Sequence, residues 1–361
     1  MGFRISATSS MGTETIVSRA PTRIDLAGGT LDLWPLYLFL DHPITINLGI
    51  DLFAEARIES LGDDAGIVLR SEDQGIEARF QWNELAKAQV SPALELHLKL
   101  LRFFARDQKQ KQSLRLTTKA KSPAGAGLGG SSTLSVALIG ALASWARGKI
   151  VAPLTEGENF IEIVRDVEST VIQVPAGLQD YYGAMYGGLQ SLQWGFGSHE
   201  RRWLSQEILT ELEQRLLLFY SGQSRNSGIN NWVLYKGFID RQPGLRQKFE
   251  KIAAATKDLE SALEHGDWQA VGQAISEEWE TRQTLANGIS TPEIGAAFAA
   301  AKKIAPVTGK ICGAGGGGCF FLYLPEADPD VKEAIQKSLS NEGIRPLPFK
   351  AVPHGLEIQR A

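Results

Sequence analysis

The sequence predicts an α+β protein with two domains, on three observations. Its 361 residues are enough for two hydrophobic cores that share an interface. Short runs of apolar and β-branched residues fill most of 14–80, which is typical of strands. Helix-period runs lie at 93–108 and within 243–303, so helices and strands are mixed along the chain. We place a domain boundary near residue 195, which gives domains over 1–195 and 196–361.

The individual elements follow from these patterns. Strands of the first domain are expected at 14–27, 43–60, 65–72, 76–82 and 113–121. Strands that follow Gly188 are expected at 189–194, 215–222, 310–325 and 344–352. The apolar run at 33–40 contains Pro35, and we expect a short buried helix there.

Composition excludes several classes of partner. The net charge is −4 and no basic tract of five residues occurs, so a nucleic-acid partner is not expected. With no secretory signal and no run of eighteen apolar residues, we expect no membrane partner and a cytoplasmic location. Cys312 and Cys319 flank a glycine block and are expected to be packed thiols in a reducing compartment.

The segment 121–138 predicts a phosphate-binding loop. Pro123 and a series of glycines precede Ser131 and Ser132, and a helix-period apolar run follows. Free N–H groups and the dipole at a helix N-terminus attract phosphate, and glycines let a backbone approach it closely. The plainer interpretation is a flexible loop with an N-cap. The segment lacks the Gly-Lys-Ser/Thr ending of a Walker A loop. The expected phosphate contacts are Pro123, Gly125, Gly127, Leu128, Gly129, Gly130, Ser131 and Ser132.

A second candidate site lies near the N-terminus. The strand that carries Arg23 ends at Gly28-Gly29, and Thr30 and Asp32 follow it. A hydroxyl and a carboxylate at a strand end can bind a small polar ligand. The alternative makes Asp32 an N-cap of the following apolar segment and Arg23 an ordinary surface residue.

A third feature is the glycine block within KICGAGGGGCFFLYL at 310–324. Glycine loses more backbone entropy on folding than any other residue, so such density requires a reason. The usual reason is close approach of backbone to backbone or to a ligand. The alternative is a tight turn between two strands, for which one or two glycines would be enough.

Together these segments resemble the three motifs of the GHMP kinases, in the same order and with similar spacing. APTRIDLAGG matches the first motif, SPAGAGLGGSST the second and KICGAGGGGCFFLYL the third. The resemblance implies an N-terminal domain like ribosomal protein S5 domain 2 and a C-terminal ferredoxin-like domain. It also implies transfer of a phosphoryl group from ATP, with Mg²⁺, to a hydroxyl group.

The resemblance also assigns roles. Asp180, in GLQD, corresponds to the catalytic aspartate that accepts the proton of the acceptor hydroxyl, and Arg23 to the basic residue beside it. Glu168 and one serine of the Ser131-Ser132 pair correspond to the Mg²⁺ ligands, and a gap-free match favours Ser131. The plainer alternatives are a turn residue for Asp180 and a solvated helix face for Glu168.

The acceptor side is most similar to the heptose-phosphate kinases and fucokinase domains, through AGGTLDLWPLY and GLQDYYGAMYGGL. This implies a sugar or sugar-phosphate acceptor, with a D-glycero-D-manno-heptose 7-phosphate type as the best guess. Arg225 would bind a second phosphate. The expected substrate contacts are Thr30, Asp32, Asp180, Arg225, Gly315 and Gly316.

Two departures from the heptose-kinase pattern affect this pocket: an inserted Leu31, and Tyr181 where glutamine is common. The rival enzyme class is a mevalonate or phosphomevalonate kinase of the same superfamily. The rival outside enzymes is a sensor that binds nucleotide and sugar without transfer. The partner is otherwise a small molecule, and the chain is expected to be a monomer or homodimer.

Overall fold

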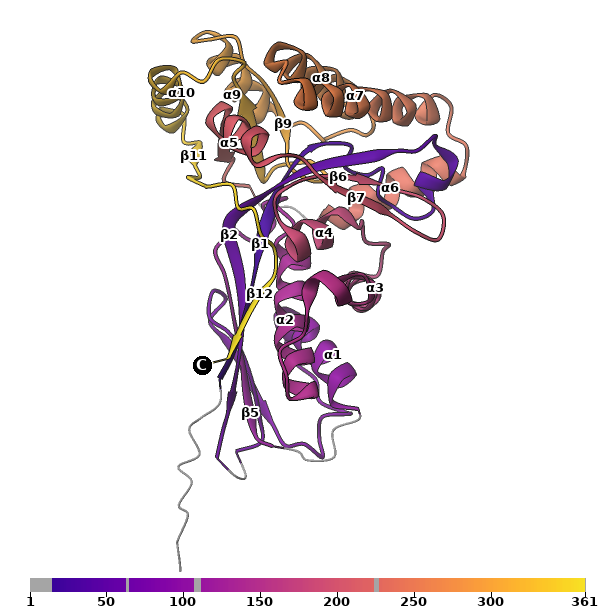
Figure 1. Ribbon diagram of the computed structural model, residues 1–361, viewed down its shortest axis with the longest axis vertical. Helices are drawn as coiled ribbons and strands as arrows, with labels where there is room; N and C mark the ends of the chain where they lie inside the picture. The colour runs from indigo at the N-terminus through magenta and orange to yellow at the C-terminus, as the bar shows by residue number, and fades with distance from the viewer. Residues whose placement is uncertain (1–14, 63–64, 107–111, 224–226, 361) are drawn as a thin grey trace, which may run out of the picture.

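The computed structural model describes residues 15–62, 65–106, 112–223 and 227–360. Its long lower part is a twisted sheet with helices on one face, and a second group of helices and strands lies across the upper end (Figure 1). The predicted α+β fold is confirmed.

The large sheet is almost entirely antiparallel. Its main path runs β12-β1-β2-β5-β3-β4; β6 pairs with β2 and with β7, and β3 and β5 pair in parallel. Its strands are β1 (Thr15–Ala27), β2 (Ile44–Ser60), β3 (Ile67–Ser71), β4 (Ile76–Phe80), β5 (Leu114–Ala120), β6 (Leu189–Gln193), β7 (Glu200–Trp203) and β12 (Glu357–Arg360). Strands β7 and β12 lie beyond residue 195 yet pair with strands before it. These pairings cross the expected boundary near residue 195, and the division into two domains at that residue stays a prediction.

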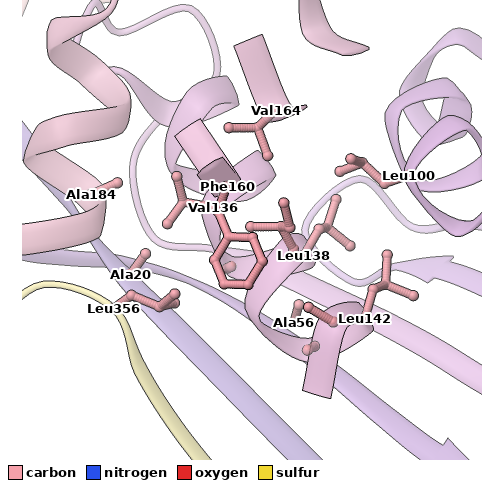
Figure 2. Packing of buried hydrophobic residues seen from close by; sticks show 14 of the residues in the cluster. Ala20, Ala56, Leu100, Val136, Leu138, Leu142, Phe160, Val164, Ala184 and Leu356 are labelled. Carbon is pink, nitrogen blue, oxygen red and sulfur yellow. The ribbon is translucent and has the colours of Figure 1, made fainter. Parts of the chain in front are cut away.

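Four helices cover one face of this sheet: α1 (Pro92–Ala105), α2 (Gly130–Arg147), α3 (Pro153–Ile172) and α4 (Gln179–Tyr186). Helix α2 is apolar on most of its circumference because it lies between the sheet and the other helices. Figure 2 shows Val136, Leu138 and Leu142 of α2 among apolar side chains of the neighbouring elements. At the N-terminal end of α2, Oγ1 of Thr133 donates to the carbonyl of Pro21, so this end of the helix lies against β1.

The upper part contains a small antiparallel sheet of order β11-β8-β10-β9. Its elements are α5 (Gln206–Arg215), β8 (Leu216–Tyr220), α6 (Ser227–Ile239), α7 (Leu245–His265), α8 (Trp268–Arg282), α9 (Pro292–Lys302), β9 (Thr308–Ile311), β10 (Cys319–Tyr323), α10 (Pro329–Asn341) and β11 (Arg345–Pro346). One buried cluster joins Ile24 and Leu48 of the large sheet to Leu259 of α7 and Ile275 of α8. The two parts therefore share a hydrophobic interface.

The expected buried helix at 33–40 is only partly right. A short 3-10 helix, η1 (Leu36–Phe39), forms there with Leu36 and Tyr37 buried, whereas Trp34 is 60% exposed. Pro35 has no N–H to donate, and the segment is too short to bury a whole helical face. None of the helices in the described ranges combines the length and the hydropathy of a membrane span.

A buried histidine in the first core predicts a pH-dependent stability. His97 of α1 is 1% exposed, its Nε2 lies 2.7 Å from Oγ1 of Thr118, and burial lowers its pKa to about 4. The unfolded chain takes up this proton near pH 6.5, so stability is complete above that pH and declines as the pH falls toward 4. We expect the free energy of unfolding to fall by about 2 kcal/mol between pH 7.5 and pH 5.

Urea unfolding at the two pH values measures this loss. In His97→Gln, which keeps a polar group beside Thr118, the free energy of unfolding should change less with pH by that amount. An equal pH dependence in the wild type and the variant would show that His97 does not carry it.

Candidate active site

The three glycine motifs meet at one cavity of about 420 Å³. Arg23, Thr30 and Asp32 line it from the end of β1 and the turn that follows. The loop before α2 forms another wall, Glu168 and Asp180 come from α3 and α4, and Gly313 and Ala314 come from the third motif. Residues up to about 290 positions apart in the sequence therefore share one site.

The loop before α2 has the conformation that its glycines predict. Gly125, Gly127 and Gly129 have φ values of 67°, 76° and 74°, which L-residues rarely adopt. Helix α2 begins at Gly130, so its free N–H groups and the positive end of its dipole lie at the cavity wall. Of the eight expected phosphate contacts, all but the fully buried Leu128 line the cavity.

The third motif packs its backbone against this loop. The N–H of Cys319 donates to the carbonyl of Ala126 at 2.7 Å, and a Cβ built on Gly127 would lie 2.2 Å from the carbonyl oxygen of Cys312. The glycine block thus joins two antiparallel strands and also supports the loop before α2. The two cysteines are free and buried.

Gly315 and Gly316, which were expected to contact substrate, pack against Ile289 outside the cavity. The N–H of Gly316 donates to the carbonyl of Ile289 at 2.7 Å, and a Cβ on Gly315 would lie 2.7 Å from Cγ2 of the same residue. Neither glycine is among the residues that line the cavity. Arg225 lies outside the described residues.

Arg23 and Asp180 form a salt bridge at the cavity. Nε and Nη2 of Arg23 donate to Oδ1 of Asp180 at 2.9 and 2.5 Å, and Nη1 donates to the carbonyl of Gly127 at 2.8 Å. Arg23 is 2% exposed, so it is not a surface residue, whereas the side chain of Asp180 is 25% exposed. Burial alone would lower the pKa of Arg23, but the charges of Asp180 and Asp25 raise it. The Asp180 carboxylate is therefore held at a fixed place with one oxygen occupied.

Glu168 is a buried carboxylate, not part of a solvated helix face. It is 4% exposed and accepts hydrogen bonds from Tyr181 Oη at 2.7 Å and Ser135 Oγ at 3.2 Å. Burial raises the pKa of Glu168 above the usual value, although the hydroxyls of Ser131 and Ser132 beside it act in the opposite direction. Both serines of the pair are thus close to this carboxylate. Within the described part of the chain, its hydrogen-bond partners are hydroxyl groups rather than cations.

Asp32 stabilises the start of α4 from a distant segment instead of capping the residues that follow it. Its Oδ2 accepts the N–H of Gln179 at 2.9 Å, next to Asp180. Burial raises the pKa of Asp32 to about 6, and the charge of Asp180 adds to the effect although the Gln179 bond opposes it. The first motif is thereby attached directly to the segment that carries Asp180.

A buried ionic network beneath the cavity was not predicted. Lys310 Nζ lies 3.2 Å from Oδ2 of Asp25 and 3.0 Å from Oε1 of Glu278, and all three residues are 0% exposed. Arg282 of α8, 2% exposed, forms a salt bridge with Glu278 at 2.5 Å. The sequence signals that could have revealed this network are an aspartate and a lysine within apolar strands, Asp25 in β1 and Lys310 in β9. Glu278 and Arg282 look like an ordinary i,i+4 surface pair in the sequence.

Comparison with known proteins supports one family. The chain matches the GHMP kinases N terminal domain over residues 95–188 and the GHMP kinases C terminal domain over residues 259–344. It is 25% identical over 342 residues to a D-glycero-alpha-D-manno-heptose 7-phosphate kinase of Campylobacter jejuni, covering 91% of this chain and 94% of that one.

Two further similarities agree with this match. The chain is 28% identical over 359 residues to an L-fucokinase/L-fucose-1-P guanylyltransferase of Bacteroides fragilis, covering 92% of this chain and 37% of that longer protein. Its fold is similar to the crystal structure of a D-glycero-D-manno-heptose 1-phosphate kinase from Bacteroides thetaiotaomicron. The TM-score is 0.73 at 21% identity, with 96% of this chain and 99% of the other covered. Motifs, fold and both domain matches agree, and the chain belongs to the GHMP kinases.

Proposed function

We propose that this protein transfers the γ-phosphoryl group of ATP to a hydroxyl group of a sugar or sugar phosphate. The observation that carries the proposal is the Arg23–Asp180 salt bridge in a cavity whose wall is a glycine loop at a helix N-terminus. Such a wall binds phosphates, and a fixed carboxylate beside it can receive a proton. The names of the heptose 7-phosphate kinase and fucokinase relatives support a sugar acceptor.

Asp180 would accept the proton of the acceptor hydroxyl as the new P–O bond forms. Arg23 occupies Oδ1 with two hydrogen bonds, which leaves Oδ2 for that hydroxyl. The same guanidinium also holds the carbonyl of Gly127, so one side chain sets the carboxylate and the phosphate loop relative to each other. Arg23 thereby acts at the acceptor and the donor sides of the reaction.

The donor set around Glu168 fits Mg²⁺. This ion prefers a few protein oxygens together with substrate phosphates, and a buried carboxylate flanked by Ser131 and Ser132 at the phosphate loop offers that. When bound with ATP, Mg²⁺ neutralises phosphate charge. Within the described residues, no group of three or more His, Cys, Asp or Glu side chains is placed to hold a metal by itself, so the nucleotide would supply the remaining ligands.

Thr30 and Asp32 would bind acceptor hydroxyls, since both line the cavity close to Asp180. We keep a D-glycero-D-manno-heptose 7-phosphate type as the best guess, on the similarity to the Campylobacter jejuni kinase. In that case Arg225 would bind the phosphate that the acceptor already carries.

Glu168→Gln tests the metal assignment. We expect the Mg²⁺ concentration for half-maximal rate to rise about tenfold or more, because even outer-shell partners of a bound metal are worth that much. The matched control is Glu158→Gln on the same helix, where Glu158 also accepts tyrosine hydroxyls, from Tyr182 and Tyr186, but does not line the cavity. Equal Mg²⁺ dependence in the two variants would remove Glu168 from the metal site.

The function itself is tested by ADP release from ATP and Mg²⁺ with a panel of acceptors: heptose 7-phosphate, fucose, galactose, other hexoses and their phosphates, and mevalonate. We expect turnover on one sugar or sugar phosphate. Turnover on mevalonate would favour the other branch of the family. ATP binding with no turnover on any sugar would support a sensor, and absence of ATP binding would refute the phosphate loop.

A further inference from the structure

Two side chains of α8 hold the turn that follows β1. Arg282 Nη2 donates to the carbonyl of Gly29 at 2.6 Å, and Nη1 donates to Oγ1 of Thr30 at 3.3 Å. Oε1 of Glu278 accepts the N–H of Gly28 at 3.2 Å. Three consecutive residues of the turn are therefore attached to one helix of the upper part of the molecule.

This turn needs external support because its backbone is strained. Thr30 has a φ of 76°, and this left-handed conformation is a genuine outlier for a β-branched residue. Such strain persists only where the surroundings enforce it. The two Arg282 contacts lie at Thr30 itself and at the preceding carbonyl, which is where that enforcement is required.

The 28–32 turn also positions the acceptor side of the cavity. Two residues after Thr30, the carboxylate of Asp32 accepts the N–H of Gln179, the neighbour of Asp180. Glu278 and Arg282 are not among the residues that line the cavity. They can therefore act on the acceptor only through the turn.

The charges of the network make the attachment stiff. Asp25, Lys310, Glu278 and Arg282 are all buried and give two positive and two negative charges. A buried, balanced set of this kind resists separation because each charge would lose its partner in a low-dielectric interior.

We propose that Arg282 is a positioning residue, which with Glu278 holds the 28–32 turn in the shape that acceptor binding requires. The kinetic part of this proposal rests on the proposed function. Helix α8 thus sets the affinity for the acceptor without touching it, and the affinity for ATP depends on α8 much less.

Arg282→Lys is the test variant, because it keeps the charge opposite Glu278 but loses the planar fork that reaches Gly29 and Thr30. We expect KM for the acceptor to rise roughly tenfold, the scale of one lost charge-assisted hydrogen bond, with KM for ATP within about twofold of the wild type. Glu278→Gln acts on the same turn through Gly28 and should shift the acceptor KM in the same direction.

Arg215→Lys is the matched control. Arg215 is also largely buried, pairs with a glutamate four residues earlier and donates to backbone carbonyls, but it lies away from the cavity. A similar loss of melting temperature in both lysine variants, with the acceptor KM raised only in Arg282→Lys, separates positioning from general stability.

Hydrogen exchange gives a second result that does not depend on activity. The amides of Leu31 and Leu33 donate within the turn, to Gly28 and Thr30, and should exchange faster in Arg282→Lys than in the wild type or Arg215→Lys. Unchanged exchange would overturn the proposal, as would faster exchange with an unchanged acceptor KM. If the wild type phosphorylates no sugar, the proposed function fails, whereas faster exchange confined to the turn still supports the positioning role.

Discussion

Asp180→Asn is expected to lower kcat by about 10²–10⁴-fold, the usual range for loss of a general base. Asparagine keeps the size of the side chain but cannot take the proton of the acceptor hydroxyl. ATP should bind with nearly unchanged affinity, because the phosphate loop and Glu168 are retained. The variant should fold, since Arg23 still has the charge of Asp25 nearby.

Steady-state kinetics and equilibrium ATP binding measure the two parts of this prediction separately. A fall in kcat with intact ATP affinity identifies an interaction made in the transition state. Wild-type turnover in Asp180→Asn would exclude Asp180 as the base, and loss of ATP binding would give it a structural role in the nucleotide site instead.

Gly127→Ala is expected to weaken ATP binding strongly. The new Cβ would lie 2.2 Å from the carbonyl oxygen of Cys312, a backbone atom that cannot rotate away, so the phosphate loop must move off the third motif. Arg23 Nη1 donates to the carbonyl of Gly127 itself, and that hydrogen bond would be disturbed as well. We expect the Kd for ATP to rise by roughly tenfold or more, the cost of lost preorganisation.

Gly148→Ala is the control that isolates this contact. Gly148 also has a left-handed φ, 64°, at the opposite end of α2, but a Cβ there meets nothing within 4 Å. Both variants carry roughly 1–2 kcal/mol of backbone strain. Only Gly127→Ala adds the clash with the third motif. If both variants bound ATP equally well, the packing of the third motif against the loop would have no part in nucleotide binding.

The strands and the glycine loop before α2 could be predicted because their signals are local. The alternating run at 44–60 needs only its own neighbours to be recognised as a strand, and the dense glycines before α2 permit the left-handed backbone that three of them adopt. The resemblance to the family motifs then predicted that Arg23, Glu168 and Asp180 share one site. In the structure all three line the same cavity.

What could not be predicted depends on contacts between distant segments. Arg282 and Thr30 are 252 positions apart, and neither residue type indicates the other. Gly315 and Gly316 belong to a glycine-dense motif, but which of its glycines reach the cavity is decided by how the loop packs on Ile289. In the apolar run at 33–40, Leu33 and Leu36 join the core of the upper part, whereas Trp34 and Phe39 remain exposed.

The central claim is that this cavity transfers a phosphoryl group to a hydroxyl. The most direct measurement uses ATP whose γ-phosphate is labelled with ¹⁸O, together with Mg²⁺ and the best acceptor of the panel, and follows the product by mass spectrometry. The account predicts a sugar phosphate that carries three labelled oxygens with the wild type, and almost none with Asp180→Asn. A label found only in inorganic phosphate, or an equal yield of sugar phosphate from both proteins, would contradict it.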